Sequence, residues 1–279
     1  MPRTWLITGI SRGIGAAIAR AGLDRGETVI GTTRTGTSDL DPGAGTLHVL
    51  TLDVTNEAQA RAVVERAHEL GAGRIDVLVN NAGHGLLAAI EDTADDEARE
   101  LFDANVFGVL NVTRAALPLL REQGGGAQIV NISSIAALAP TVGSGVYAAT
   151  KAAVNGFSGS LAQEVEAFGI GVTLVELGSF RTDFLARTSM RVGERRSPAY
   201  EGSAAAARID RLDESSGRQA GDPARAAAAI VDAVASADPP LHLVLGSDAI
   251  ERARTSAERL LADVARWEDV SRATAFESE

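Results

Sequence analysis

The chain of 279 residues contains no cysteine, which excludes a disulfide framework and any metal site built on thiolates. It also contains no apolar run close to the about 18 residues that a membrane-spanning helix needs. The net charge of −11 argues against nucleic acid or an anionic membrane as a partner, because both attract basic surfaces. The first residues lack the apolar segment of a secretion signal, so we expect a cytoplasmic protein.

Two side chains with acid–base chemistry are almost missing. Lysine and arginine together number 26, yet lysine occurs only at position 151, so the other 25 cations are arginine. A general bias toward arginine accounts for the chain as a whole and makes Lys151 stand out, since that position requires a compact ammonium group rather than a planar guanidinium. Tyrosine occurs only at positions 147 and 200, and Tyr147 lies four residues before the single lysine.

Short apolar segments alternate with longer segments of helical pattern. Hydrophobic residues make up 45% of the chain and charged residues 23%, as in ordinary globular proteins. The alternation predicts an α/β fold, a parallel sheet with helices on both faces, in a single domain over residues 1–279. The predicted strands cover residues 5–8, 28–33, 47–52, 75–79, 128–132, 171–176 and 241–245. The first predicted helix follows the first strand and ends near residue 25, and the others cover residues 56–70, 95–122, 146–168, 222–236 and 248–266.

Two segments stand outside this alternation. Residues 178–221 are rich in Arg, Ser and Gly, show no clear period and are too long for an ordinary connection. We expect this irregular segment to form a substrate-binding loop, with a disordered insertion as the alternative. Residues from about 247 to 279 are expected to form a C-terminal helical extension.

A glycine-rich turn joins the first predicted strand to the first predicted helix. Gly9, Gly13 and Gly15 have the spacing G-x-x-x-G-x-G, with no lysine inside the turn. Glycines let the backbone approach a pyrophosphate closely, and the helix start offers free amides and the positive end of a dipole. A purely structural turn is the alternative. The strand–turn–helix setting favours a dinucleotide site in a Rossmann-like, doubly wound domain with a seven-stranded, mostly parallel sheet.

The end of the second strand indicates which dinucleotide is bound. NAD sites usually carry an acidic residue about 20 residues after the glycines to hold the ribose hydroxyls. Here Arg34 occupies that region and no acid is present, while Arg12 lies within the turn itself. Two guanidinium groups suit a 2′-phosphate, although both could be ordinary solvated arginines. The sequence therefore favours NADP(H) over NAD(H).

Tyr147 and Lys151 lie four residues apart in a helical pattern and so share one helix face. A free tyrosine has a pKa of about 10 and is a poor acid–base group at neutral pH. A nearby ammonium stabilises the phenolate, so we expect Lys151 to lower the pKa of Tyr147. Taken alone, a Tyr-x-x-x-Lys pair is a weak signal, because exposed helices produce it by chance.

Several motifs occur together in one order and spacing. They are Thr8 to Gly15, Asp53-Val54, Asn80 to Gly83, Asn105, Ser134 and the pair Tyr147 and Lys151. Over about residues 1–182 the chain resembles the short-chain dehydrogenase/reductase superfamily, in which a serine also lies thirteen residues before the tyrosine. The resemblance implies hydride transfer between a nicotinamide cofactor and a carbonyl or alcohol.

The resemblance also implies roles for the motif residues. Tyr147 would exchange a proton with the substrate oxygen, Lys151 would hold the nicotinamide ribose, and Ser134 would bond the same substrate oxygen. Asn105 would position a water molecule that links Lys151 to solvent. The implied cofactor-binding residues are Gly9, Ser11, Arg12, Gly13, Ile14, Gly15, Arg34, Asp53, Val54, Asn81, Ala82, Gly83, Tyr147, Lys151, Gly178, Phe180 and Thr182.

One position departs from the family pattern. Leu177 stands before Gly178 where family members usually have proline. Leucine can adopt the backbone angle that proline enforces, so we expect more freedom in this turn. The change bears on cofactor affinity and hardly on the fold.

The four histidines, His48, His68, His84 and His242, show no ligand spacing, so we expect no metal site. His84 could line the substrate pocket, but an exposed loop position is favoured. We expect an NADP(H)-dependent oxidoreductase that acts on small carbonyl or alcohol substrates. The resemblance implies a possible homodimer or homotetramer, although the C-terminal extension could block or replace the contacts between copies. The alternatives are a regulatory nucleotide-binding protein and an enzyme of epimerisation or dehydration without net redox change.

Overall fold

A computed structural model describes residues 2–276, and its centre is a seven-stranded sheet. All neighbouring strands in this sheet run parallel, which confirms the predicted doubly wound α/β fold. In spatial order the strands are β3 (Thr46–Thr51), β2 (Thr28–Thr33), β1 (Thr4–Thr8), β4 (Val77–Asn80), β6 (Gln128–Ser134), β7 (Gly171–Leu177) and β9 (His242–Leu245).

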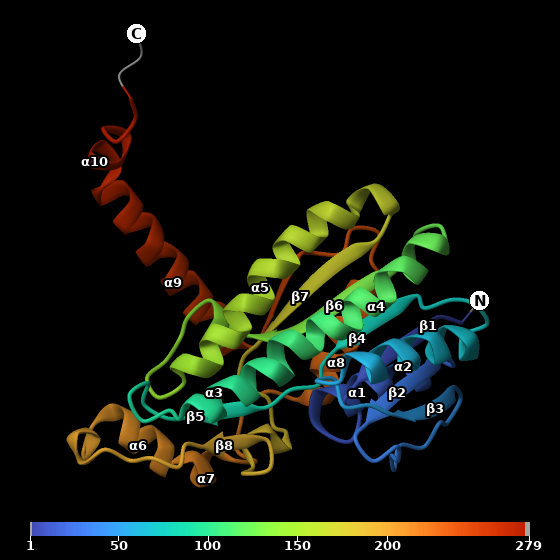
Figure 1. The fold of residues 1–279 in the computed structure, drawn as a ribbon, viewed down its shortest axis with the longest axis horizontal. Coiled ribbons are helices and arrows are strands. Elements are labelled where there is room, and N and C mark those ends of the chain that lie inside the picture. Colours follow the sequence, from blue (N-terminus) through green and yellow to red (C-terminus); the bar gives the residue numbers. More distant parts are fainter. Residues whose placement is uncertain (1, 277–279) are drawn as a thin grey trace.

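Helices cover both faces of the sheet (Figure 1). One face carries α2 (Glu57–Leu70), α4 (Gly108–Glu122) and α5 (Gly145–Val165), whose apolar residues pack in one core cluster. The other face carries α1 (Gly13–Leu23) and α8 (Pro223–Ala235), which pack against each other and against the sheet. Strands β1 and β4 are buried along their whole length, so the continuous apolar runs seen in the sequence correspond to two-sided burial.

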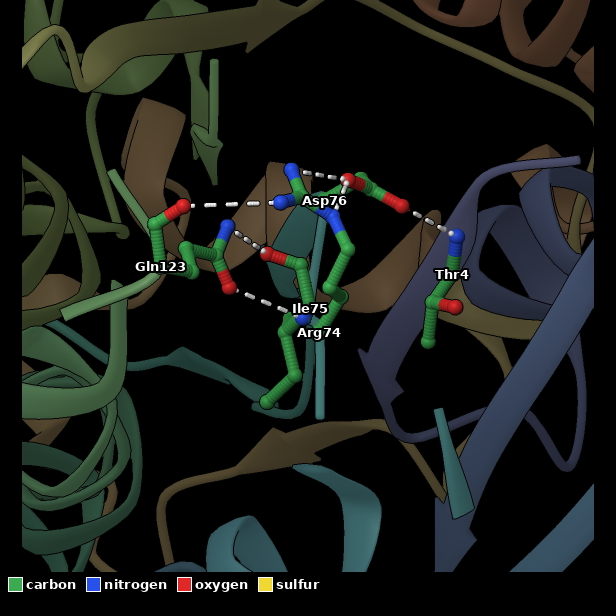
Figure 2. A network of polar contacts seen from close by, with 5 residues as sticks. All are labelled: Thr4, Arg74, Ile75, Asp76 and Gln123. Carbon is green, nitrogen blue, oxygen red and sulfur yellow. Dashed lines mark hydrogen bonds and ion pairs between the residues drawn. The ribbon is translucent and has the colours of Figure 1, made fainter. Parts of the chain in front are cut away.

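Polar side chains close the amino ends of the central strands (Figure 2). The Asp76 carboxylate, just before β4, accepts a hydrogen bond from the Thr4 backbone N–H at 2.8 Å. The Gln123 amide, after α4, donates to the carbonyl of Ile75 at 2.9 Å and accepts from its N–H at 3.1 Å. These bonds satisfy backbone groups at the amino ends of β1 and β4, where the pairing of these strands begins.

The segment 178–221 is more ordered than the sequence indicates. It contains short 3₁₀ turns, strand β8 (Met190–Val192) and helices α6 (Ala204–Asp210) and α7 (Leu212–Ser215). Strand β8 pairs with β5 (Gly85–Leu87), and Met190 packs with Leu87, Ile209 and Leu212. The sequence did not reveal these elements, because elements this short show no readable period, and a role of the segment in substrate binding stays a prediction. We call residues 183–215 the lid.

The predicted helix over residues 95–122 is also divided. Helix α3 (Asp95–Phe102) leads into a π-helical turn (Asp103–Phe107), and α4 follows. The N–H of Gly108 bonds the carbonyl of Asp103, five residues back, in place of the usual four. Wider turns of this kind occur often at functional sites, and this one contains Asn105.

The C-terminal extension consists of α9 (Ser247–Arg266) and α10 (Glu268–Arg272). Helix α9 starts beside β9 and then runs away from the body of the molecule (Figure 1). Its outer half exposes Leu260, Leu261 and Val264, whereas Arg252 and Ser256 still bond the loop after β6. The predicted extension also includes residues 277–279, which lie outside the part of the chain that the structure describes. Among residues 2–276, no helix combines the length and apolar character that crossing a bilayer requires.

Candidate active site

A cavity of about 540 Å³ opens at the carboxyl ends of the parallel strands. Such edges are where open α/β sheets bind ligands, because the loops after neighbouring strands converge there. Almost all of the predicted site residues line this one cavity: Gly9, Ser11, Arg12, Gly13, Ile14, Arg34, Asp53, Val54, Asn81, Ala82, Gly83, Ser134, Tyr147, Lys151, Gly178, Phe180 and Thr182. Gly15 and Asn105 lie outside the lining, behind it.

The glycine turn is built so that its backbone faces the cavity. Gly9 and Gly13 have φ of +74° and +63°, a region that side chains rarely adopt. A Cβ on Gly15 would lie 2.3 Å from the carbonyl oxygen of Gly9, so this glycine permits close packing of the turn against α1. The turn is anchored to the sheet because the N–H groups of Gly9 and Ile10 both bond the Thr32 carbonyl at 3.0 Å.

Asn81 and Thr8 join the glycine turn to the loop after β4. The Asn81 amide donates to the carbonyls of Thr8 and Gly9 at 2.9 and 2.8 Å. The Thr8 hydroxyl accepts from the backbone N–H groups of Asn81 and Ala82 at 2.9 and 3.0 Å. Asn81 therefore acts here by shaping the turn. Thr8 begins the glycine motif in the sequence, and the structure gives it the role of a positioning residue.

The two arginines near the predicted adenosine end lie in different settings. Arg34 is exposed at the end of β2. Arg12 donates to the Ser189 hydroxyl at 3.1 Å and to the Thr188 carbonyl at 3.2 Å, which ties the glycine turn to the lid. Neither guanidinium is ion-paired with a carboxylate in the described part of the chain. Both therefore remain able to bind an anionic group.

Tyr147 and Lys151 lie on one face of α5, as predicted, and each side chain is only 7% exposed. The Lys151 ammonium donates to the Ile132 carbonyl at 2.8 Å and lies 6.0 Å from the centre of the Tyr147 ring. Burial lowers the pKa of Lys151 to about 8. The Lys151 ammonium is thus directed at the carboxyl-terminal part of β6, and its pKa lies close to physiological pH.

The prediction that Lys151 lowers the pKa of Tyr147 was wrong for this structure. Burial raises the pKa of Tyr147 to about 12, and the hydroxyl of Ser134 only partly opposes that shift. The physical reason is that the ammonium bonds a backbone carbonyl, so it does not offset the loss of water around the phenol. The phenol is therefore protonated at neutral pH.

Asn105 supports the cavity from behind. Its amide donates to the His84 carbonyl at 2.8 Å and to the Thr150 hydroxyl at 3.2 Å, and its oxygen accepts from the His84 N–H at 3.0 Å. These bonds fix the turn after β4 to α5 at the position just before Lys151. Its role in holding a water molecule stays a prediction.

His84 lines the cavity, which corrects the expectation of an exposed loop position. Burial, followed by the positive charge of Arg191, lowers the pKa of His84 to about 4, so this imidazole is neutral at neutral pH. The missed signal was its place directly after Gly83, because residues that follow a central strand project toward the open edge of the sheet.

We expect His84→Gln to reduce the loss of stability on acidification. Between the unfolded pKa of about 6.5 and the native value of about 4, the unfolded chain binds a proton that the native chain rejects, so stability falls as pH falls. The variant should lose about 1 kcal/mol less than the native chain between about pH 7 and about pH 4.5, after solvent screening is allowed for. Urea unfolding at both pH values, with His68→Gln on α2 for comparison, measures this difference. Equal pH dependence in the native and His84→Gln chains would refute it.

Other cavity residues carry no local motif. They come from the loop before α5, from the lid, from the segment between the lid and α8, and from α9, and include Thr141, Ser144, Thr188, Ser189, Met190, Arg191, Arg208, Gln219 and Arg252. Tertiary packing alone brings them together, so the sequence could at most indicate the segments involved. Within residues 2–276 no group of three or more His, Asp or Glu side chains is placed to hold a metal ion.

The chain is similar in sequence and in structure to known short-chain dehydrogenases. The family model described as short chain dehydrogenase matches residues 3–192. The chain is 39% identical over 279 residues to oxidoreductase BOA17 of Botryotinia fuckeliana, covering 99% of this chain and 100% of the relative. It is 36% identical over 245 residues to a 3-ketodihydrosphingosine reductase of Bacteroides thetaiotaomicron, covering 88% of each. A short-chain dehydrogenase structure from Streptomyces avermitilis superposes with a TM-score of 0.87 at 39% identity, covering 99% and 100% of the two chains.

Proposed function

Because this chain belongs to the short-chain dehydrogenase/reductase family and is an oxidoreductase, we propose that it uses NADP(H) to interconvert a ketone or aldehyde and an alcohol. The observation that carries the proposal is the shared cavity, in which Tyr147, Ser134 and Lys151 meet a glycine turn at the start of a helix. A phenol, a hydroxyl and an ammonium are the groups that a carbonyl reduction needs beside a dinucleotide.

The chain's own residues fit a dinucleotide. Gly9, Gly13 and Ile14 line the cavity at the start of α1, where the unpaired N–H groups of a first helical turn would bind a diphosphate. Asp53 and Val54 form the wall after β3, where an adenine would lie, and Gly178 to Thr182 form the wall after β7, where a nicotinamide would lie. The bound nicotinamide would supply the hydride equivalent, which no side chain can provide.

The proton chemistry falls to Tyr147 and Ser134. In reduction, the protonated Tyr147 hydroxyl donates to the carbonyl oxygen of the substrate while the Ser134 hydroxyl hydrogen-bonds the developing alkoxide. Burial raises the pKa of Tyr147 to about 12, so the phenol is protonated at neutral pH, which is the form that donates a proton in reduction. Lys151, with a pKa of about 8, is able to exchange protons near neutrality and so to help reprotonate the phenol.

A carbonyl panel tests the proposed function. The native chain is incubated with NADPH and a series of ketones and aldehydes, and carbonyl-dependent loss of NADPH absorbance is the expected result. Tight NADPH binding without turnover of any carbonyl would instead favour a regulatory protein. Substrate conversion without net NADPH oxidation, detected by product analysis, would favour epimerisation or dehydration.

The preference for NADP(H) rests on charge at the end of β2. Arg34 is exposed to the cavity, has no acidic partner among the described residues and follows a strand that ends without an acid. A 2′-phosphate would form a charge-assisted hydrogen bond there, whereas a ribose hydroxyl would find no carboxylate to bond.

We therefore expect Arg34→Ser to lower kcat/KM with NADPH about 10- to 100-fold, the effect of one lost bond to a charged group. Activity with NADH should change by less than about threefold, because NADH has no 2′-phosphate. Arg114→Ser is the matched control, since Arg114 is exposed on α4 and away from the cavity. An equal loss with both cofactors would remove Arg34 from 2′-phosphate recognition.

A further inference from the structure

Two further arginines line the cavity beside the loop that follows β6, whereas Arg34 follows β2, which is separated from β6 by β1 and β4 in the sheet. Arg208 belongs to α6 of the lid, and Arg252 belongs to α9. The Arg208 guanidinium donates to the Thr141 hydroxyl, and that of Arg252 donates to the Ala139 carbonyl. Both are thus held against the loop 138–144, which leads directly into α5 and Tyr147.

These two cations have no counterion. In the part of the chain that the structure describes, neither is ion-paired with Asp or Glu, although acidic residues outnumber basic ones by 37 to 26 in the sequence. Burial lowers the pKa of Arg208, and the charge of Arg252 adds to that shift. Arg208 nevertheless keeps exposed surface that faces the cavity. Two neighbouring positive charges of this kind are stabilised when an anion binds between them.

Gln219 adds a neutral group with unused hydrogen-bonding capacity. It lines the same cavity, is 8% exposed, and neither its amide nitrogen nor its amide oxygen has a partner among the described residues. Its backbone carbonyl accepts from Arg181 at 3.0 Å, which fixes the residue beside the segment after β7. A buried amide without partners costs stability, and a bound polar ligand would recover that cost.

We propose that Arg208, Arg252 and Gln219 form an oxyanion-binding subsite, and that the carbonyl substrate of this enzyme carries a carboxylate or phosphate group. The planar guanidinium forks match such oxyanions, and the Gln219 amide can donate to the same group or to a neighbouring hydroxyl. Arg208 and Arg252 bond the loop that follows β6, whereas Arg34 follows β2, so substrate and cofactor would have separate anion sites. The inference rests on the proposed carbonyl chemistry and names its substrate class.

Matched substrates test this subsite. Levulinate and 5-oxohexanoate are compared with their methyl esters, and dihydroxyacetone phosphate with dihydroxyacetone, each with NADPH. We expect kcat/KM at least about 10-fold higher for the charged member of at least one pair, as one charge-assisted bond implies. The carboxylate and phosphate arms show which oxyanion fits.

Variants locate the preference in the structure. Arg208→Gln and Arg252→Gln should each lower kcat/KM for the charged substrate about 10-fold or more and leave the neutral substrate within about threefold. Arg208→Lys should restore part of the loss. Arg211→Gln and Arg254→Gln are controls, because both arginines are exposed, lie on the same two segments and do not line the cavity.

The outcomes separate the two proposals. Reduction of esters and acids at equal rates, or equal losses for both in the variants, would overturn the subsite and leave the carbonyl reductase intact. If no carbonyl is reduced, calorimetric titration of the NADP⁺-loaded native chain with pentanoate and with inorganic phosphate still decides on the subsite. Binding by the native chain that is lost when Arg208→Gln and Arg252→Gln are combined supports the subsite. Absence of binding by the native chain, or unchanged binding by the combined variant, overturns it. Matching circular dichroism spectra establish that each variant is folded.

Discussion

Replacing Tyr147 by phenylalanine is expected to lower kcat for carbonyl reduction by about 10³-fold, within the range that general acid catalysis supplies. The substitution removes one hydroxyl from a ring that is 7% exposed and packed against Phe184, so the shape of the cavity is retained. Affinity for NADPH should change by less than about threefold, because the phenol is needed for the proton and not for the phosphate groups. The steady-state rate of NADPH oxidation at saturating substrate measures kcat, and fluorescence titration measures the affinity for NADPH.

Tyr200→Phe is the matched control for this prediction. Tyr200 is the other tyrosine of the chain, and it lies in the lid outside the main cavity. Its substitution should leave kcat unchanged within about twofold. Equal rates for the native chain and Tyr147→Phe would show that the phenol takes no part in the proton transfer.

The second large effect is expected for Lys151→Arg. We expect kcat/KM to fall by at least about 10²-fold, although the positive charge is retained. Lys151 is 7% exposed and fits between α5 and the Ile132 carbonyl, where a guanidinium is both larger and unable to release its proton. A group with a pKa of about 8 is thereby replaced by a permanent cation.

The control is the reverse substitution, of an arginine by lysine, at an exposed position outside the cavity. Arg114→Lys on α4 should leave both kcat and KM unchanged within about twofold. Folding of Lys151→Arg is monitored by urea unfolding, because overpacking lowers stability by about 1–3 kcal/mol. A folded Lys151→Arg chain with native activity would show that the position requires only a positive charge.

The local parts of this site could be predicted from the sequence. The glycine turn is read from three residues beside a strand, and the shared face of Tyr147 and Lys151 follows from helical geometry alone. The parallel sheet follows from the alternation of strands and helices, and its buried strands are visible as apolar runs. Each of these signals depends on residues that are close in the chain.

The remaining features depend on contacts between distant segments. Arg252 belongs to the C-terminal extension, for which no cavity contact was predicted, and Arg12 meets Ser189 across 177 positions of sequence. The raised pKa of Tyr147 also escaped prediction, because spacing on a helix does not show how deeply a phenol is buried or where a lysine directs its ammonium. Short elements such as β5 and β8 escaped for a simpler reason, since three residues show no period.

Transfer of deuterium from the cofactor to the product tests the central claim most directly. NADPH labelled with deuterium at C4 of the nicotinamide, in each of the two stereochemical forms, is incubated with the native chain and a carbonyl that it reduces. We expect one form to deliver deuterium to the carbinol carbon of the alcohol, detected by mass spectrometry, and the other to deliver none. Alcohol formed without deuterium from either form would contradict direct hydride transfer beside Tyr147.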